Sequence, residues 1–222
     1  MSFDLLAPVY SLMERLTAGG KMQCCRTAYL DEITPPRRVL TLGEGHGRFL
    51  CACRRRFPEA EITCVDSSAA MLAQARRALA KQGMDDRRVH FIQDDILSWS
   101  PTRGTFDLVV THYFLDCFRA DQLAAIVPHI ASAAADDASW LLADFQVAAQ
   151  GWRRRRSACI LALMYAFFRV FTRLPAKELT PPEPFLSRAG FSPHRHMEME
   201  WGLMKSAWWR RSGSLEPSPF VS

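Results

Sequence analysis

Glycine occupies every second position in a short stretch that directly follows an apolar run. Val39–Leu42 predicts a β-strand because its side chains are aliphatic or β-branched, and the segment that begins at Arg48 has helical character. The loop between them reads Gly43-Glu44-Gly45-His46-Gly47. Glycine lets a ligand lie directly on the backbone, and the N–H groups and dipole at the start of a helix favour a negatively charged group. The sequence therefore predicts an anion-binding loop between a strand and a helix.

The spacing of these glycines separates the loop from two other nucleotide-binding motifs. The dinucleotide motif G-x-G-x-x-G would need its third glycine where the chain has Arg48. The P-loop would need Lys followed by Ser or Thr after Gly47, and the chain has Arg48-Phe49 instead. A glycine turn with a purely structural role stays open as an alternative.

Acidic residues lie at the ends of the next two predicted strands. Glu61–Asp66 is a β-rich run that ends in a carboxylate about 20 residues beyond the glycine loop, where an acid can hold a ribose diol. Val89–Gln93 is the third predicted strand, and Asp94, Asp95 and Ile96 follow it. The position of Asp66 favours a ligand that contains adenosine.

In this order the motifs resemble those of class I S-adenosylmethionine-dependent methyltransferases. The resemblance implies S-adenosyl-L-methionine as the cofactor, with its ribose on Asp66, its adenine beside Met71 and its amino-acid end on the glycine loop. Because the family usually has an acid where this chain has Thr41, we expect Glu44 to meet the ammonium group instead. The residues expected to contact the cofactor are Gly43, Glu44, Gly45, Gly47, Asp66, Met71, Asp95, Ile96, Thr111 and Tyr10. Met71 as a helix core residue, and Tyr10 as an aromatic at the core edge, stay open as alternatives.

Three residues at the same sheet edge are candidates for a general base. His112 and Asp116 follow the fourth predicted strand, Thr105–Val110, and Asp144 lies near the end of the fifth, Ser139–Phe145. A base helps methyl transfer when the acceptor is a hydroxyl or an acidic carbon. A structural role for His112 and a helix-capping role for Asp116 are equally compatible with the sequence.

The residues after the fourth strand also bear on the acceptor. Thr111-His112-Tyr113-Phe114 lacks the prolines that the resemblance would require for an enzyme acting on the amino groups of DNA bases, and no Pro-Cys pair is present. Nucleic acid is therefore not the expected acceptor. In outline the chain resembles ubiquinone and menaquinone biosynthesis methyltransferases, which favours a small apolar or aromatic acceptor.

Five strands that alternate with helices up to Phe145 predict an α/β fold with a doubly wound parallel sheet. The resemblance implies a Rossmann-like sheet of seven strands, mostly parallel, with one antiparallel strand near the C-terminus. We expect one methyltransferase domain over residues 1–222, divided into five parts. These are N-terminal cap helices (1–34), a cofactor-binding core (35–146), a helical lid after the fifth strand (147–182), a C-terminal helix and strand pair (183–211) and a tail (212–222).

The most hydrophobic segment, Ala158–Phe171, follows a run of four arginines. It is shorter than the roughly 20 residues that a membrane-spanning helix needs, and Arg169 interrupts it. Three interpretations stay open: a lid over the substrate, a buried core helix, or peripheral contact with a membrane through residues 152–174.

Charge and cysteine content complete the expectations. The net charge of +5 is compatible with a basic surface. Seven cysteines without a C-x-x-C pair predict reduced thiols, no metal site and a cytoplasmic protein, with the inner face of a membrane as the place of any peripheral contact. Two rival functions remain: a methyltransferase-like domain without catalysis that binds a partner or a membrane, and another adenosine-cofactor enzyme such as an NAD-dependent oxidoreductase.

Overall fold

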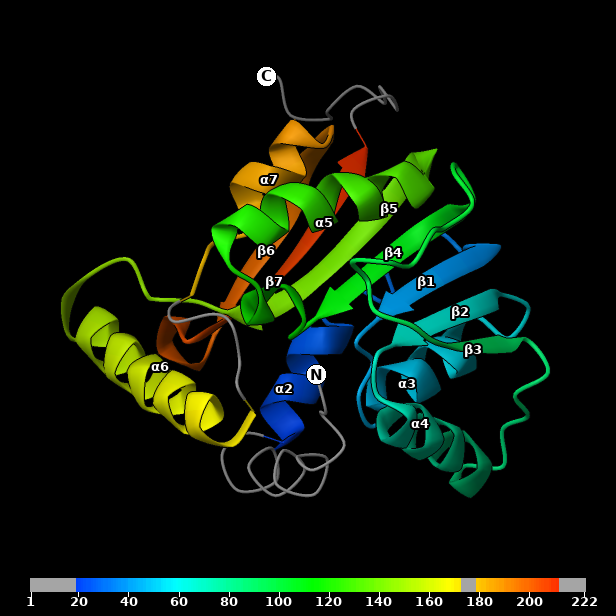
Figure 1. Cartoon of the computed structure of the whole chain (residues 1–222), viewed down its shortest axis with the longest axis horizontal. Helices are drawn as coiled ribbons and strands as arrows, with labels where there is room; N and C mark the ends of the chain where they lie inside the picture. Colours follow the sequence, from blue (N-terminus) through cyan, green and yellow to red (C-terminus); the bar gives the residue numbers. More distant parts are fainter. Residues whose placement is uncertain (1–18, 173–178, 212–222) are drawn as a thin grey trace.

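A seven-stranded sheet forms the centre of the molecule. The computed structural model describes residues 19–172 and 179–211. The strands are β1 (Arg38–Leu42), β2 (Glu61–Asp66), β3 (Val89–Gln93), β4 (Phe106–His112), β5 (Ala134–Phe145), β6 (Phe191–Met199) and β7 (Met204–Arg211). They lie in the order β3-β2-β1-β4-β5-β7-β6 (Figure 1). Only β7 runs against the others, since it pairs antiparallel with both β5 and β6. The predicted fold class is therefore confirmed.

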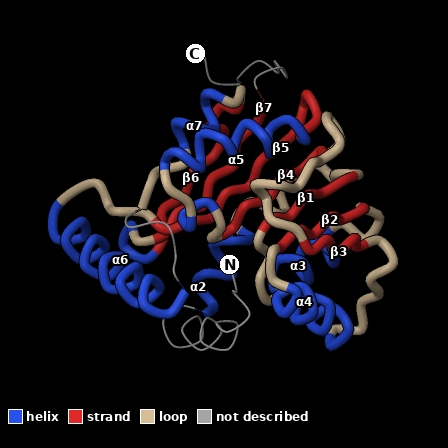
Figure 2. Tube along the Cα trace, viewed as in Figure 1, coloured by secondary structure: helices blue, strands red, loops and turns tan. Residues whose placement is uncertain are grey.

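Helices cover both faces of the sheet (Figure 2). On one face lie α2 (Gly19–Thr27), α3 (Arg48–Arg56) and α4 (Ala69–Lys81), and on the other lie α5 (Ala120–Ala133) and α7 (Glu183–Arg188). Strand residues alternate between the two faces, so Val109 and Trp140 pack on the α5 side and Val110 and Leu141 on the α3 side. Two buried cores hold the sheet between the helix layers.

Local sequence explains most of these elements. The apolar run of β4 is almost continuous, as expected for a strand with both faces covered. Ser68 caps α4, because its Oγ accepts a hydrogen bond from the Met71 N–H (3.2 Å). The fifth strand begins at Ala134, five residues before its predicted start, and an irregularity in β4 between Phe106 and Leu108 accommodates that extension. Alanine at 134 and 135 fits either a helix or a strand, so the sequence pattern could not place this boundary.

The segment after β5 forms one helix, α6 (Gly151–Thr172), which lies beside the sheet rather than across either face (Figure 1). Leu161 and Tyr165 are its buried contacts, and they pack with Phe145 and Leu203. Among the described residues no helix is long and apolar enough to cross a membrane. Because Leu161 and Tyr165 pack against Phe145, α6 lies next to the end of β5.

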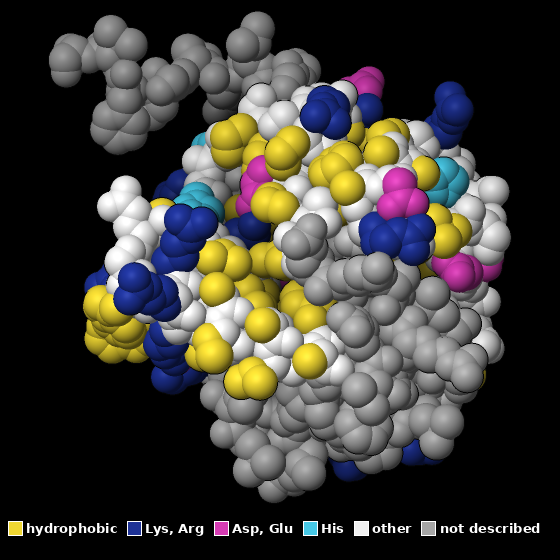
Figure 3. Space-filling view, turned by 60° about the vertical axis from the view of Figure 1, so that its left-hand side comes forward, with side chains coloured by type: hydrophobic (Ala, Val, Ile, Leu, Met, Phe, Trp, Pro, Cys, Tyr) yellow, Lys and Arg dark blue, Asp and Glu magenta, His cyan; other side chains and the backbone are white. Residues whose placement is uncertain are grey.

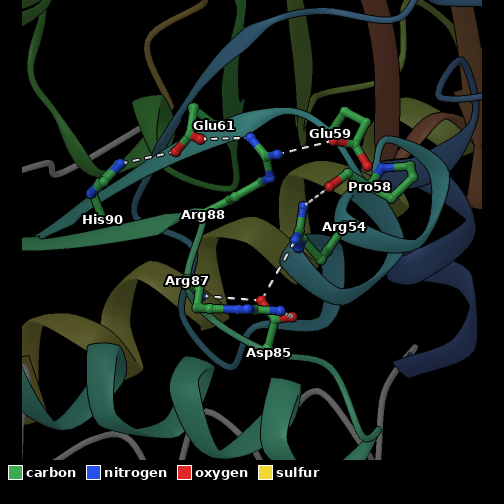
Figure 4. Close-up of polar contacts among 8 residues, drawn as sticks. All are labelled: Arg54, Pro58, Glu59, Glu61, Asp85, Arg87, Arg88 and His90. Carbon is green, nitrogen blue, oxygen red and sulfur yellow. Dashed lines mark hydrogen bonds and ion pairs between the residues drawn. The ribbon is translucent and has the colours of Figure 1, made fainter.

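Exposed ion pairs hold together the opposite edge of the sheet, where β2 and β3 begin (Figure 4). Arg88 contacts Glu61 at 3.0 Å and Glu59 at 3.0 Å, and His90 Nε2 lies 3.1 Å from Glu61 Oε2. We call Glu59, Glu61, Arg88 and His90 the exposed charge network. It lies at the amino-terminal ends of the strands, away from the edge that carries the predicted site.

Candidate functional site

The glycine loop lies at the carboxyl end of β1. Gly45 and Gly47 have left-handed backbone angles (φ 64° and 75°) that favour glycine. A Cβ on Gly47 would lie 2.7 Å from the Ala75 Cα, so glycine lets α3 start tightly against α4. A Cβ on Gly45 would meet nothing within 4 Å. Gly45 is therefore the position where a ligand has room to approach the backbone, whereas Gly43 is covered by the Phe114 ring.

Glu44 is partly buried within this loop. Its Oε1 accepts a hydrogen bond from the Leu50 N–H in the first turn of α3 (2.8 Å). Burial raises the pKa of Glu44 to about 7, although this hydrogen bond and the nearby charge of Arg26 oppose the rise. The carboxyl thus caps α3 with one oxygen, and its predicted contact with an ammonium group stays a prediction.

The ends of β2 and β3 meet the glycine loop. The Gly43 N–H donates to the Val65 carbonyl (3.0 Å), and the Asp94 N–H donates to the Asp66 carbonyl (3.2 Å). Asp66 Oδ1 accepts from the Ser68 N–H (2.9 Å). The three segments predicted to hold an adenosine ligand therefore form one continuous edge.

The adenine-side residues occupy both buried and exposed positions on this edge. Met71 is buried in α4, and Ile96 is buried below the loop after β3. Asp95 is exposed, and its Oδ1 accepts from the Leu97 N–H (3.0 Å). Asp94 Oδ1 accepts from the Asp95 N–H (2.8 Å), so Asp94 closes the turn and leaves the Asp95 side chain at the surface.

Two further residues, Thr111 and Tyr10, were also predicted to contact the cofactor. Thr111 is fully buried, and its hydroxyl accepts a hydrogen bond from Trp140 Nε1 (2.8 Å) within the core. This arrangement gives no support to a contact between the Thr111 side chain and the cofactor. Tyr10 lies outside the described residues.

Two buried carboxyl groups lie together beyond β4 and β5. Asp116 stands in the short helix η2 (Leu115–Cys117), and Asp144 is fully buried near the end of β5. Burial raises the pKa of Asp116 to about 6, although hydrogen bonds from the Cys117 thiol and from Asp144 oppose the rise. Burial and the charge of Asp116 raise the pKa of Asp144 well above its ordinary value. We call these two residues the carboxyl pair.

The two oxygens of the Asp144 carboxyl differ in their hydrogen bonds. Asp144 Oδ1 accepts from the Phe145 N–H (2.9 Å), whereas Asp144 Oδ2 has no partner among the described residues. Because burial raises the pKa values of both acids, the pair as a unit holds its protons more tightly than two free carboxyl groups would.

Two residues that were not predicted from the sequence extend this group: Lys205, which is buried, and Glu183, which is half-buried. Lys205 is opposite Asp144 in the β5–β7 register, is almost fully buried, and forms an ion pair with Glu183 of α7. Its charge lowers the pKa values of both members of the carboxyl pair. A single lysine within the apolar run Met204–Trp209 was the available signal. Its partners, however, come from elements far away in the sequence.

His112 stands at the end of β4, with its side chain on the α3 side of the sheet. Its ring packs edge-on against Phe49, with ring centroids 4.6 Å apart. Burial and the charge of Arg26 lower the pKa of His112 well below its ordinary value. Nδ1 of this imidazole has no hydrogen-bond partner among the described residues. His112 is therefore neutral and offers one free nitrogen.

No group of three or more residues suited to hold a metal ion occurs in the described part of the chain.

Comparison with known proteins shows what the segment that forms this edge resembles. Residues 39–137 match the methyltransferase domain family, and this segment contains the glycine loop, Asp66, Asp95 and the carboxyl ends of β1 to β4. This match agrees with the resemblance of the motifs to class I methyltransferases. The cofactor of such a methyltransferase domain is S-adenosylmethionine, as the motifs predicted.

Individual relatives agree with the methyltransferase domain. A demethylmenaquinone methyltransferase of Thermus thermophilus is 33% identical over 109 residues, which span 48% of this chain and 48% of that relative. The chain thus matches about half the length of this curated relative. Mitomycin 7-O-methyltransferase MmcR is structurally similar, with a TM-score of 0.68 and 19% identity over 95% of this chain and 61% of that one.

One further solved structure has nearly the same extent as this chain. It is the 1,6-didemethyltoxoflavin-N1-methyltransferase of Burkholderia thailandensis, with a TM-score of 0.64 and 17% identity over 94% of this chain and 86% of that one. That structure contains 1,6-didemethyltoxoflavin and S-adenosylhomocysteine. At this identity the likeness concerns the fold.

Proposed function

We propose that the chain transfers a methyl group from S-adenosylmethionine to a small apolar or aromatic acceptor. The observation that carries this proposal is the continuous edge formed by the glycine loop, Asp66 and the turn after β3. Buried acids lie next along the same edge, beyond β4 and β5. An open α/β sheet binds its ligands at this edge.

The residues present fit the cofactor. The free space over Gly45 leaves backbone N–H groups open to the carboxylate, and Asp66 would hold the ribose. Met71 and Ile96 offer apolar contacts for the adenine. The partly buried Glu44 carboxyl would meet the ammonium group, which would favour the ionised form of the carboxyl. When bound, the cofactor supplies an electrophilic methyl group on a sulfonium. Correct positioning of the acceptor can then contribute on the order of 7 to 11 kcal/mol.

Asp116 is our proposed general base. Above pH values near 6 it is mainly a carboxylate. If the acceptor is a hydroxyl, Asp116 would take up its proton during methyl transfer, while the carbon–sulfur bond to the methyl group would break and the demethylated cofactor would leave as a neutral thioether. His112 is the alternative, because its neutral ring carries an unpartnered nitrogen.

Aromatic side chains support an apolar acceptor. Phe114 packs against Phe118 with ring centroids 5.1 Å apart, and Tyr113 packs against Phe145 at 5.0 Å. The Tyr165 hydroxyl of α6 donates to the Asp116 carbonyl (2.9 Å). This bond supports α6 as part of the lid proposed for residues 147–182. Such a lid would keep water away from the acceptor. Peripheral membrane contact through residues 152–174 stays a proposal too.

Calorimetry with S-adenosylmethionine and with NAD tests the choice of cofactor. We expect binding of S-adenosylmethionine alone, and a preference for NAD would support the oxidoreductase alternative. Gly45→Val should abolish binding because its side chain fills the space over the loop. Gly104→Val is the matched control, since Gly104 also has a left-handed angle (φ 61°) and open space around it. Equal affinities of the two variants would contradict the assigned site.

Methyl transfer itself is tested with a panel of phenols, quinones and apolar acids, corrected for cofactor hydrolysis. Turnover of any acceptor supports the proposal. Cofactor binding without turnover of any acceptor would support a methyltransferase-like domain that has lost catalysis.

A further inference from the structure

The outward side of α6 combines exposed aromatic, basic and apolar side chains. Trp152 is 59% exposed, and Leu163 is 67% exposed. Along the rest of the described outward face, the exposed residues are Ala158, Cys159, Ala162 and Ala166. An outward helix face of a globular domain normally carries polar residues. This face carries none between Ala158 and Ala166.

Helical geometry places the largest of these side chains along one line. Trp152, Cys159 and Leu163 are separated by seven and four residues, which at 3.6 residues per turn brings them to the same side. The buried residues Leu161 and Tyr165 lie on the opposite side and attach α6 to the sheet. The apolar outward face is therefore not needed to hold α6 in place.

A second tryptophan reaches the same surface from a different part of the chain. Trp201 stands in the turn η3 (Glu200–Gly202) between β6 and β7 and is 56% exposed. Its ring centroid lies 5.7 Å from that of Trp152, and the Arg153 guanidinium lies over both rings, at 5.5 Å and 5.9 Å. We call Trp152, Arg153 and Trp201 the tryptophan–arginine cluster.

The backbone is strained where it presents Trp201. Glu200 and Trp201 both have left-handed backbone angles (φ 51° and 60°), which are unfavourable for residues other than glycine. Arg156 Nη1 donates to the Glu200 carbonyl (3.3 Å), and the Glu200 carboxylate pairs with Lys21. These contacts hold a large apolar side chain in solvent at a cost in free energy, without burying it.

The charge of the surface selects an anionic partner. Arg153, Arg154 and Arg155 are exposed in the first turn of α6, and the helix contains no acidic residue. The positive end of the helix dipole lies at this turn, so the arginines are unfavourably placed until an anion approaches. An open groove of about 630 Å³ lies between them, lined by Gly151, Trp152, Arg154, Arg155 and Ala158. Figure 3 shows basic and hydrophobic side chains side by side on this face.

We infer that this surface docks the chain onto a membrane that contains anionic phospholipids. The arginines lie at the level of the phosphate groups, the two tryptophans enter the interface, and the apolar side of α6 meets the acyl chains. Tryptophan is the residue that favours this interfacial depth. An acidic protein would match the arginines but would leave the alanine and leucine face unexplained.

Vesicle flotation tests this inference with the full chain. We compare phosphatidylcholine vesicles with vesicles of phosphatidylcholine mixed with phosphatidylglycerol. Binding should require the anionic lipid and should weaken as salt is raised. Equal binding to both kinds of vesicle, or to neither, would overturn the inference. A chain that binds neither but dimerises through this face, measured by light scattering, would assign the surface to a second copy.

Charge reversal supplies a matched pair of variants. Arg154→Glu with Arg155→Glu should lower vesicle affinity by about tenfold or more. Arg77→Glu with Arg103→Glu changes the net charge equally at exposed positions elsewhere and should have a much smaller effect. Similar losses in both double variants would show that net charge alone attracts the vesicles and would overturn the assigned surface.

Tryptophan replacement separates the apolar contribution from the charge. The double variant Trp152→Ala with Trp201→Ala should also bind vesicles more weakly in the flotation assay. This loss of vesicle binding should persist at raised salt. All variants should keep their affinity for S-adenosylmethionine, because α6 contributes none of the proposed cofactor contacts. Vesicle binding by a chain that fails to bind the cofactor would therefore contradict the proposed function and leave the membrane surface standing.

Discussion

Carboxylates occur in two contrasting settings at opposite edges of the same sheet. In the exposed charge network, hydrogen bonds from His90 and Arg88 outweigh partial desolvation and lower the pKa of Glu61. In the carboxyl pair, burial dominates and raises the pKa values of Asp116 and Asp144, although Lys205 lies nearby. Both groups include a cation, so the presence of an opposite charge does not decide whether the pKa of a carboxyl group rises or falls. Exposure to solvent decides it, and only the buried pair holds its protons more tightly than free carboxyl groups do.

Asp116→Asn gives the largest expected difference between the two settings. Methyl transfer to a hydroxyl or carbon acceptor should slow by about 10²- to 10⁴-fold, because the amide cannot take the proton. Glu61→Gln, the matched change in the exposed charge network, should leave the turnover number unchanged. The measurement is the turnover number at saturating acceptor. A similar rate in both variants would exclude Asp116 as the base and leave His112.

Lys205→Met should destabilise the fold, because it leaves the buried carboxyl pair and the half-buried Glu183 without a cation. We expect a loss of about 3 to 5 kcal/mol in the free energy of unfolding, measured with urea. Arg88→Met removes a cation from the exposed charge network and should cause a change near the limit of measurement. Equal losses would show that burial does not distinguish the two groups.

The pH dependence of stability should have opposite signs in the two settings. Asp116 has a folded-state pKa of about 6, above its unfolded value, so its stabilising contribution is complete at low pH and disappears as pH rises through about 6. Asp116→Asn should remove this decrease in stability with rising pH. Glu61 has a lowered pKa, so its contribution is present above its unfolded pKa and disappears as pH falls. Urea unfolding of both variants between about pH 3 and 7 measures the difference. A parent chain whose stability rises over this range as Asp116 ionises would contradict the pKa assignment.

The rate of methyl transfer should follow the same ionisation. It should rise with pH through about 6 and then level, since Asp116 must be a carboxylate to accept a proton. Glu61→Gln should keep this profile. A rate that falls across this range would indicate that the protonated form of Asp116 is the active one.

Tyr165→Phe gives the smallest expected effect. It removes the hydroxyl that donates to the Asp116 carbonyl and should cost about 1 kcal/mol in the stability of α6. Amide hydrogen exchange along α6 is the measurement. Tyr29→Phe is the control, because no hydrogen bond of the buried Tyr29 hydroxyl is found within the described residues. Unchanged exchange in Tyr165→Phe would remove the link between α6 and the carboxyl pair.

The sequence predicted the parts of this molecule that depend on local pattern. The bounds of β2 and β3 were predicted residue for residue, because β-rich runs are followed there by turn or capping residues such as Ser68. The edge at which we expect the cofactor follows from the same kind of pattern, since loops after parallel strands meet at one edge. The resemblance to methyltransferases and the fold class are confirmed.

Long-range pairing was beyond the same reasoning. Nothing near Lys205 in the sequence indicates that it lies opposite Asp144 or pairs with Glu183. The contact between Trp201 and Trp152 likewise joins two segments about fifty residues apart, and it depends on the angle at which α6 leaves the sheet. Such contacts are set by the packing of whole elements rather than by local side-chain pattern.

The position of β7 also governs the order in which this fold can be completed. This last strand inserts between β5 and β6, so neither has its final neighbour until residues up to Arg211 have been synthesised. Until then β5 presents an open edge that can pair with another chain. Contacts this distant in sequence form slowly. Lys205 reaches the carboxyl pair only when this strand is in place. The surroundings of the proposed general base would therefore be completed in the final folding step. Partly made chains would be inactive and prone to association.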